Sequence, residues 1–359
     1  MIVALIYKEK LPLMCFIAVS AVSLIIGAAM SFVCKNKNDR IYAKEGFVIV
    51  TLAWLSVSVL GALPFVLSGE IPSFTDAFFE TVSGFTTTGS SVVDNVEELS
   101  KSILFWRSFT HWIGGMGVLV FIMAVIPSFS DRSIHILRAE MPGPVVDKIV
   151  PRAKNMAKIL YLIYIAMTLS EIALLLCGGM PLFDSIVHSF GTAGTGGFGI
   201  KADSIASYSN YSKWVISVFM MLFGINFNLY YLLLVRKIKE VFKSLELWIY
   251  ISLVLVSTAI ISANIYHLYG NLSSTFRDSF FQVSSLMTTT GFATVDYATW
   301  PQLSQTILFI VMFVGGCAGS TAGGIKTTTF AVMVILLFNQ FRGKDESTVF
   351  NRALEDNIV

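Results

Sequence analysis

The sequence predicts an all-α membrane protein that crosses the bilayer several times. Of its 359 residues, 55% are hydrophobic and only 13% are charged, whereas charged residues make up about 25% of a soluble globular chain. The mean hydropathy of +0.73 agrees with this reading. The apolar residues gather in runs of about 20, the helix length that crosses a hydrocarbon core about 30 Å thick. So few charges could not cover the surface of a soluble fold.

Six apolar segments are long enough to be single spans, and a seventh is too long. The first run, residues 11–34, exceeds the roughly 7–15 residues of a signal-peptide core and is interpreted as a span. The seventh, residues 297–341, carries Lys326 as its only charge and is broken by the glycine-rich stretch 315–324, so it predicts a split span. The six single spans are predicted at residues 11–34, 46–69, 108–130, 159–183, 214–235 and 247–270.

The basic residues predict which ends of the spans face the cytoplasm. Of the 25 Lys and Arg residues, 17 follow the first, third and fifth spans or lie in the tail, and 5 lie on the opposite side. By the positive-inside rule the first set is cytoplasmic. The loops 35–44, 132–158 and 236–243 are therefore candidate docking surfaces, although basic inner loops occur in any membrane protein. The net charge of only +2 excludes nucleic acid as a partner.

The sequence carries no motif for catalysis or for a resident cofactor. Its four cysteines lie singly in or beside apolar runs, without the spacing of a zinc site or a disulfide framework. There is no nucleophile elbow, no His-Glu-x-x-His, no P-loop and no pair of catalytic carboxylates. We therefore expect no enzymatic activity and no cofactor in this chain. A membrane enzyme or an assembly factor stays as the alternative from another class.

A repeated motif occupies three connections on the outer side. Residues 74–89 read FTDAFFETVSGFTTTG and residues 276–291 read FRDSFFQVSSLMTTTG, with Phe, Asp, Phe-Phe and Thr-Thr-Thr-Gly at identical offsets. Residues 183–198, FDSIVHSFGTAGTGGF, form a weaker copy, in which the Asp is one residue nearer to the glycine taken as equivalent. Self-similarity of this kind indicates a repeated structural unit.

Each copy predicts a short helix followed by a Thr/Gly strand. An Asp at the expected N-cap opens a helix too short to span the bilayer. Non-helical backbone at membrane depth is tolerated only where it is buried in protein or lines a water-filled cavity. A single Thr-Thr-Thr-Gly is more often a turn or a re-entrant segment, but three copies in equivalent positions favour an ion filter, in which carbonyl oxygens replace the hydration shell of K⁺.

On these residues the chain resembles the Trk/Ktr/HKT superfamily of cation transporters, and most of all the bacterial TrkH/KtrB potassium-uptake subunits. The resemblance implies a pseudo-fourfold pore with K⁺ as the transported ion, in a multi-pass protein of the bacterial cytoplasmic membrane. The stretches that carry it are residues 74–89, 105–116, 194–198, 288–294 and 315–326. The filter residues that it implies are Thr87, Thr88, Gly89, Gly194, Thr195, Gly196, Thr289, Thr290 and Gly291.

The resemblance also assigns a role to the glycine-rich stretch of the split span. In the family this stretch is an intramembrane loop beneath the filter, which obstructs the pore until it moves. The implied gate residues are Gly315, Gly316, Gly319, Ser320, Gly323, Gly324 and Lys326. The alternative for Lys326 is a stop-transfer charge that extends to the inner surface. The implied partners are a cytosolic nucleotide-binding regulatory ring, TrkA- or KtrA-like, and a second copy in a homodimer.

The repeats divide the chain and leave three questions open. The predicted units are an N-terminal span and loop (1–45), three pore repeats (46–153, 154–245 and 246–341) and a cytoplasmic tail (342–359). Because the family has four repeats, we expect a fragment of a longer reading frame or dependence on another polypeptide; a non-conducting fragment is one alternative. A Na⁺-conducting or Na⁺/K⁺-cotransporting relative is another, although Gly89 is typical of K⁺-preferring members. Glu171, inside a span, either couples protons or Na⁺ or is a hydrogen-bonded interface carboxylate.

Overall fold

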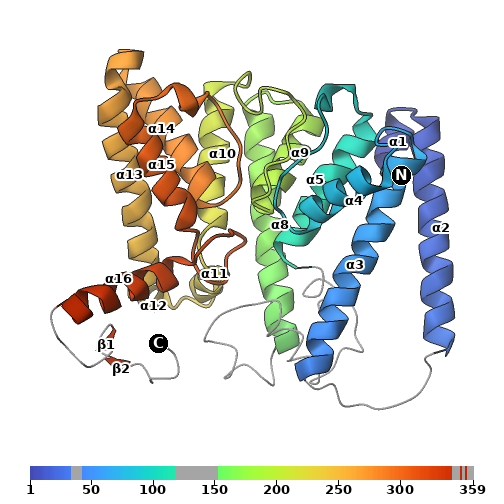
Figure 1. The fold of residues 1–359 in the computed structure, drawn as a ribbon, viewed down its shortest axis with the longest axis horizontal. Helices are drawn as coiled ribbons and strands as arrows, with labels where there is room; N and C mark the ends of the chain where they lie inside the picture. The colour runs from blue at the N-terminus through green and yellow to red at the C-terminus, as the bar shows by residue number, and fades with distance from the viewer. Residues whose placement is uncertain (34–42, 118–152, 342–347, 350–351, 354–359) are drawn as a thin grey trace.

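The computed structural model describes residues 1–33, 43–117, 153–341, 348–349 and 352–353 (Figure 1). Within these residues nearly all regular structure is helical, and the prediction of an all-α fold is confirmed. The exception is a pair of two-residue strands in the tail, β1 (Thr348–Val349) and β2 (Arg352–Ala353), which pair in antiparallel fashion.

Four of the described helices are long and apolar enough to cross a bilayer. They are α2 (Lys10–Val33), α3 (Ala43–Leu67), α8 (Ala153–Cys177) and α13 (Leu245–Tyr269), which follow the short helix α1 (Ile2–Ile6) in the chain. These helices match the first, second, fourth and sixth predicted spans. Large apolar side chains stay exposed along α2, including Leu24 and Phe32, as expected of a helix that faces lipid.

Three short helices occupy the positions predicted for the repeated motif. They are α4 (Phe74–Phe85), α9 (Leu182–Ala193) and α14 (Leu272–Met287). The predicted N-cap role of the aspartates is wrong, because Ser73, Pro181 and Asn271 hold the N-cap positions. Asp76 and Asp184 lie instead in the first turn, where a negative charge still interacts favourably with the helix dipole.

The helices that follow the repeated motif differ from the predicted spans. Helix α5 (Lys101–Gly115) begins before residue 108, and residues 118–130 of that predicted span lie outside the described part of the chain. The predicted span 214–235 is wrong as a single helix. It is a pair, α10 (Asn210–Phe223) and α11 (Phe227–Leu234), bent by 90°. Asn226 caps α11 by accepting a hydrogen bond from the N–H of Asn228 at 2.9 Å.

The interruption predicted in the last apolar stretch is present. Helix α15 (Gln302–Phe313) ends before residues 314–326, and α16 (Thr327–Phe341) resumes after them. The N–H of Gly315 donates to the carbonyl of Ile325 at 2.8 Å, so the two ends of the interruption are held together at its base. We call residues 314–326 the gate loop, after the role that the resemblance in the sequence implies for them. The short helices η1 (Val96–Glu98), α12 (Ile238–Phe242) and η4 (Tyr297–Thr299) complete the fold.

Each short helix of the motif packs against the helices that flank it in sequence. Helix α4 contacts α3 and α5, α9 contacts α8 and α10, and α14 contacts α13 and α15. The three groups stand beside one another in chain order across Figure 1, with α12 and α16 at the opposite end of the molecule from the loops around the short helices. Further contacts of α5 with α9 and of α10 with α14 join neighbouring groups.

Candidate functional site: the filter segments and the gate loop

The segments that follow the three short helices, residues 86–89, 194–197 and 288–291, share an uncommon backbone conformation. We call them the filter segments, after the role predicted for them from the sequence. Thr87, Thr195 and Thr289 have φ values of 55°, 51° and 58°, a region in which a β-branched residue is a genuine outlier. Only six described non-glycine residues have positive φ, and these three threonines hold the same place after α4, α9 and α14. Each such conformation costs on the order of 1–3 kcal/mol, and strain of this kind gathers at functional sites.

The same main-chain hydrogen bond supports all three segments. The N–H of the residue after each left-handed threonine returns to a carbonyl in the last turn of the preceding helix. The three bonds join Thr88 to Ser83 at 2.9 Å, Gly196 to Gly191 at 3.0 Å and Thr290 to Ser285 at 2.8 Å. The hydroxyls of Ser83 and Ser285 also donate to Ser90 and Phe292 carbonyls at 2.6 Å. The three segments therefore have one architecture.

The structure changes the register of the second copy by one residue. The glycines with positive φ are Gly89 (77°), Gly197 (75°) and Gly291 (84°), so Gly197 is the counterpart of the other two. Gly194 ends α9 in the right-handed region and corresponds to Thr86 and Thr288 at the ends of α4 and α14. The predicted set 194–196 thus omits Gly197. Counted to Gly197, the Asp lies thirteen residues earlier in all three copies.

Neighbouring segments touch through these glycines. A Cβ placed on Gly89 would lie 1.9 Å from the carbonyl oxygen of Gly196, and one placed on Gly197 would lie 1.8 Å from that of Thr290. Only a residue without a side chain allows main chains to approach so closely. A Cβ on Gly291 would have no described atom within 4 Å. The first segment therefore lies against the second, and the second against the third.

His111 supports the second segment from α5. Its side chain is fully buried, and its Nδ1 lies 2.8 Å from the carbonyl oxygen of Gly84, to which it donates. The ring packs on Phe198 with 4.1 Å between centroids, and a Cβ on Gly196 would meet Nδ1 at 2.4 Å. The ring of His111 therefore packs directly against the second filter segment.

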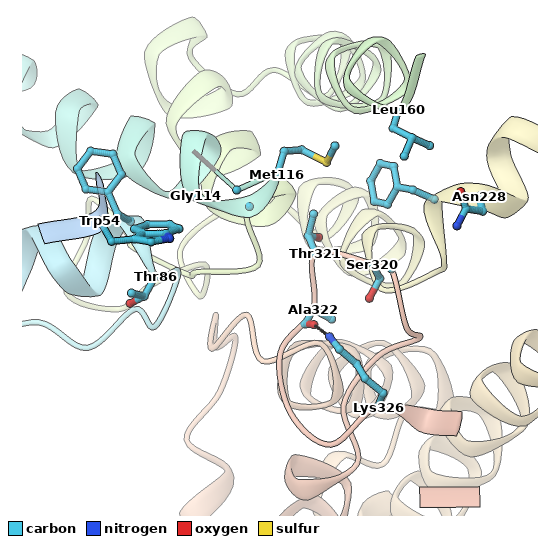
Figure 2. A pocket seen from close by; sticks show the side chains of 15 residues that line it. Trp54, Thr86, Gly114, Met116, Leu160, Asn228, Ser320, Thr321, Ala322 and Lys326 are labelled. Atoms are coloured by element: carbon cyan, nitrogen blue, oxygen red, sulfur yellow. Dashed lines mark hydrogen bonds between the residues drawn. The ribbon is translucent and has the colours of Figure 1, made fainter. Parts of the chain in front are cut away.

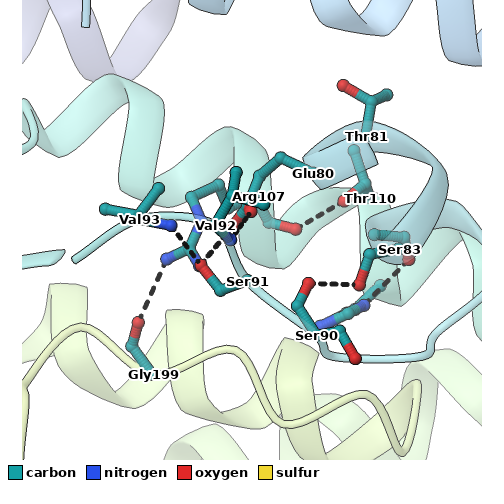
Figure 3. Close-up of polar contacts among 12 residues, drawn as sticks. Glu80, Thr81, Ser83, Ser90, Ser91, Val92, Val93, Arg107, Thr110 and Gly199 are labelled. Atoms are coloured by element: carbon teal, nitrogen blue, oxygen red, sulfur yellow. Dashed lines mark hydrogen bonds and ion pairs between the residues drawn. The ribbon is translucent and has the colours of Figure 1, made fainter. Parts of the chain in front are cut away.

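A buried ion pair lies within the first group, and its arginine reaches the second group by donating to the carbonyl of Gly199 at 3.4 Å (Figure 3). Glu80 in α4 accepts from the Nε of Arg107 at 2.7 Å, from the hydroxyl of Ser91 at 3.0 Å and from the N–H of Val92 at 3.0 Å. Arg107 in α5 extends over the ring of Phe198, 4.2 Å from its centroid. Both charged side chains are at most 2% exposed. The pair therefore ties the chain leaving the first filter segment to the second repeat.

We expect Arg107→Ala to lower the free energy of unfolding by about 3–5 kcal/mol, because removal of one partner leaves the other charge buried and unpaired. The measurement is unfolding in mixed detergent micelles. The matched control is Lys237→Ala, which breaks a pair with Glu240 at 3.3 Å in which both side chains are more than half exposed; such pairs contribute about 1 kcal/mol or less. Equal losses in the two variants would contradict the role of the buried pair.

Other buried polar groups lie behind the second segment. Both ring nitrogens of His188 and both carboxylate oxygens of Glu171 are buried without a hydrogen-bond partner among the described residues. The hydroxyl of Thr192, near Glu171, donates instead to the carbonyl of His188 at 2.9 Å. The Thr192 side chain nevertheless interacts with the Glu171 carboxylate across the contact between α8 and α9, so both readings of Glu171 stay predictions. Its place is in α8 against α9, behind the filter segment.

The gate loop lies against the second and third filter segments. The Thr195 hydroxyl donates to the carbonyl of Thr321 at 2.8 Å, and the N–H of Gly323 donates to the hydroxyl of Thr289 at 2.9 Å. Two of the three left-handed threonines thus bind the loop directly. A Cβ on Gly323 would lie 2.8 Å from the Thr289 hydroxyl oxygen, so the absence of a side chain permits this approach.

A cavity of about 370 Å³ separates the gate loop from the first repeat (Figure 2). Trp54, Phe85 and Thr86 line one side of it, and loop residues from Gly319 to Ala322 line the other. The ammonium group of Lys326 also lines the cavity and donates to the carbonyl of Ala322 within the loop. In the structure Lys326 is thus a loop residue that faces the cavity, in contrast to the alternative of a snorkelling stop-transfer charge.

Main-chain oxygens and hydroxyls are the polar groups that the three segments present. Among the described residues there is no group of three or more His, Cys, Asp or Glu side chains that could hold a metal ion. Thr86 and Thr88 share a hydroxyl hydrogen bond of 2.8 Å, as do Thr288 and Thr290. The arrangement suits a cation that is bound transiently by oxygens.

The fold and these segments define an α-helical, multi-pass membrane protein built from repeated units, each with a short helix and a strained segment after it. The chain belongs to the TrkH family of cation transport proteins, because the model of that family matches residues 12–359. This is a family of transporters, and the resemblance found in the sequence is confirmed.

Curated relatives and a solved structure agree with this membership. The chain is 36% identical to the Trk system potassium uptake protein TrkG of Escherichia coli K12, covering 99% of this chain and 73% of that protein. It is 37% identical to TrkH of the same organism, covering 100% and 76%. The crystal structure of the potassium transporter TrkH from Vibrio parahaemolyticus superposes with a TM-score of 0.84 at 30% identity, covering 99% of this chain and 76% of that one. The chain thus spans about three quarters of these relatives.

Proposed function

We propose that this protein takes up K⁺ across the cytoplasmic membrane of a bacterium through a filter of main-chain oxygens. The observation that carries the proposal is the recurrence of a left-handed threonine at 87, 195 and 289, each followed two residues later by a left-handed glycine. Such strain persists only where the surrounding structure holds it. The names of the relatives, which are potassium uptake proteins, support K⁺ as the ion.

The filter segments supply the chemistry of selection. A K⁺ ion that enters between them exchanges its hydration shell for oxygens of the protein, and the number and field of those oxygens decide which cation is preferred. The proposed ligand-bearing residues are those predicted from the sequence, with Gly197 added to the second segment. The gate loop, bound to Thr195 and Thr289, obstructs the path on the far side of the filter until it moves.

The partners are part of the same proposal. A cytosolic nucleotide-binding ring would regulate the gate, so that the nucleotide cofactor belongs to that ring and not to this chain. A second copy would complete a homodimer. The description of the relatives as parts of a Trk system is consistent with partner proteins.

The test is growth of a bacterium that lacks its own K⁺ uptake systems at micromolar to millimolar K⁺, with and without this chain. Rescue, together with Rb⁺ uptake into proteoliposomes that excess K⁺ but not Na⁺ suppresses, would support the proposal. Uptake suppressed equally by Na⁺ would favour a Na⁺-conducting or Na⁺/K⁺-cotransporting protein. Absence of both rescue and liposome uptake from a folded protein would indicate a non-conducting chain.

We expect Gly89→Ser to lower the preference for K⁺ over Na⁺. The new Cβ would lie 1.9 Å from the carbonyl oxygen of Gly196, so that this oxygen, a proposed ion ligand, must move. The measurement is the ratio of Rb⁺ to Na⁺ uptake in proteoliposomes, for which we expect a drop of about tenfold, or about 1.4 kcal/mol of selectivity. An unchanged ratio would contradict the placement of Gly196 in the filter.

A further inference from the structure

The middle of the gate loop is bound by residues far from it in the sequence. The N–H of Ala318 donates to Glu246 Oε1 at 2.6 Å, across 72 positions of the chain. Glu246 lies in the first turn of α13 and is partly buried. A carboxylate that accepts from a main-chain N–H makes a charge-assisted hydrogen bond, which is roughly twice as strong as a neutral one. Glu246 therefore binds the loop at one main-chain group, the N–H of Ala318.

The same part of the loop sits in the break between α10 and α11. The N–H of Cys317 donates to the carbonyl of Gly224 at 2.9 Å, and the N–H of Phe227 donates to the carbonyl of Gly319 at 2.9 Å. The break thus supplies one acceptor and one donor that no continuous helix could offer, because a continuous helix uses these groups internally. Asn226, the capping residue of α11, also hydrogen-bonds to Glu246.

The loop has one basic residue, Lys326, and Glu246 is one of the groups whose charge acts on it. The charges of Glu246 and Lys326 influence each other, while the ammonium of Lys326 donates to Ala322 in the loop. The carboxylate thus binds the loop directly through the N–H of Ala318, and its charge attracts Lys326 at longer range. Both interactions are strengthened where water is scarce.

We propose that Glu246 is a positioning residue that fixes residues 317–319 of the gate loop in the break between α10 and α11. The inference rests on the proposed function in one respect: the proposed function makes this loop the gate. Without the carboxylate, the N–H of Ala318 loses its partner in a setting where an unpaired group is costly. Conformations in which residues 317–319 reach water are then favoured, because the loop is left with its main-chain hydrogen bonds to Gly224 and Phe227 and its filter contacts at Thr195 and Thr289.

Cys317 provides a readout that is independent of transport. Its side chain is fully buried in the loop, and the sequence has three other cysteines, at 15, 34 and 177. With those three changed to serine, the rate at which N-ethylmaleimide modifies the purified protein, followed by mass spectrometry, reports exposure of Cys317. We expect Glu246→Ala to raise this rate about tenfold, which corresponds to a loss of about 1.4 kcal/mol from the free energy that keeps the loop closed. Glu246→Gln keeps an acceptor oxygen and is expected to raise the rate less.

The matched control is Glu240→Ala in α12, which removes an exposed glutamate from the same region and should leave the rate unchanged. If Glu246→Ala is not recovered as folded protein, the modification rate of Glu246→Gln is the deciding measurement. An unchanged modification rate in a folded Glu246 variant overturns the inference, whatever the transport result. A raised rate supports it, and Rb⁺ uptake by the same variant then tests the gate separately: uptake that does not rise with the modification rate counts against the proposed gating function and not against the position of Glu246.

Discussion

Substitution of Gly197 by Ala is expected to reduce Rb⁺ uptake to about one tenth of the wild-type rate or less. The new Cβ would lie 1.8 Å from the carbonyl oxygen of Thr290 and 2.9 Å from its carbon, so the second and third filter segments must separate. The left-handed φ of 75° adds strain of about 1–3 kcal/mol. The measurement is Rb⁺ uptake into proteoliposomes at matched protein content.

Substitutions at two further glycines distinguish the effect of backbone strain on uptake from the effect of close contact between segments. Gly179 has a φ of 81° and no described atom within 4 Å of an added Cβ, and it follows α8 outside the filter. Gly291 has a φ of 84°, belongs to the filter and also has no described atom within 4 Å. We expect Gly179→Ala to retain wild-type uptake and Gly291→Ala to lose less than Gly197→Ala. If Gly179→Ala and Gly197→Ala reduce uptake equally, close contact between the segments is not what the filter requires.

Deletion of residues 319–324 is expected to raise Rb⁺ flux about tenfold or more, which corresponds to about 1.4 kcal/mol of closure energy removed from the gate. The deletion removes Thr321 and Gly323, through which the loop binds Thr195 and Thr289. It spares Gly315 and Ile325, which close the base of the loop at 2.8 Å. The measurement is flux in proteoliposomes, normalised to the amount of folded protein.

The control for this deletion is Ser320→Ala. Its hydroxyl donates within the loop, to the carbonyl of Cys317 at 2.6 Å, so its loss should leave the loop on the filter and the flux near the wild-type value. Unchanged or reduced flux in the deletion variant, with normal expression and folding, would count against the gate. A similar rise in Ser320→Ala would show that flux responds to any disturbance of the loop.

Local patterns in the sequence predicted the elements that depend on local physics. Runs of about 20 apolar residues predicted α2, α3, α8 and α13 because a bilayer imposes that length on a helix. The repeated motif predicted three short helices, because Phe, Asp and Thr-Thr-Thr-Gly recur at identical offsets in two copies and a weaker copy with Phe, Asp and a Thr/Gly run lies between them. The second copy was misaligned by one residue, since the run Gly194-Thr-Gly-Gly197 offers three glycines and the pattern alone favoured the wrong one. The spacing of thirteen residues from the aspartate was the signal that could have corrected it.

Other features could not be predicted from local patterns. The bend between α10 and α11 interrupts an apolar stretch at Gly224-Ile-Asn226, where hydropathy alone predicts a continuous span. The pair of Glu80 and Arg107 joins residues 27 positions apart, and Glu246 meets Ala318 across 72 positions. The division into three pore repeats and the cytoplasmic orientation of the basic loops stay predictions.

By itself, the sequence determined that this protein is a multi-pass membrane protein with a repeated pore motif and a broken last span, because hydropathy, helix length and internal repetition are properties of neighbouring residues. The tertiary structure alone decided which glycine of the second copy belongs with Gly89 and Gly291, and which groups hold the gate loop. Those features depend on main chains that approach within a few ångströms from distant parts of the chain, and the free energy of such contacts is set by geometry that no local pattern records.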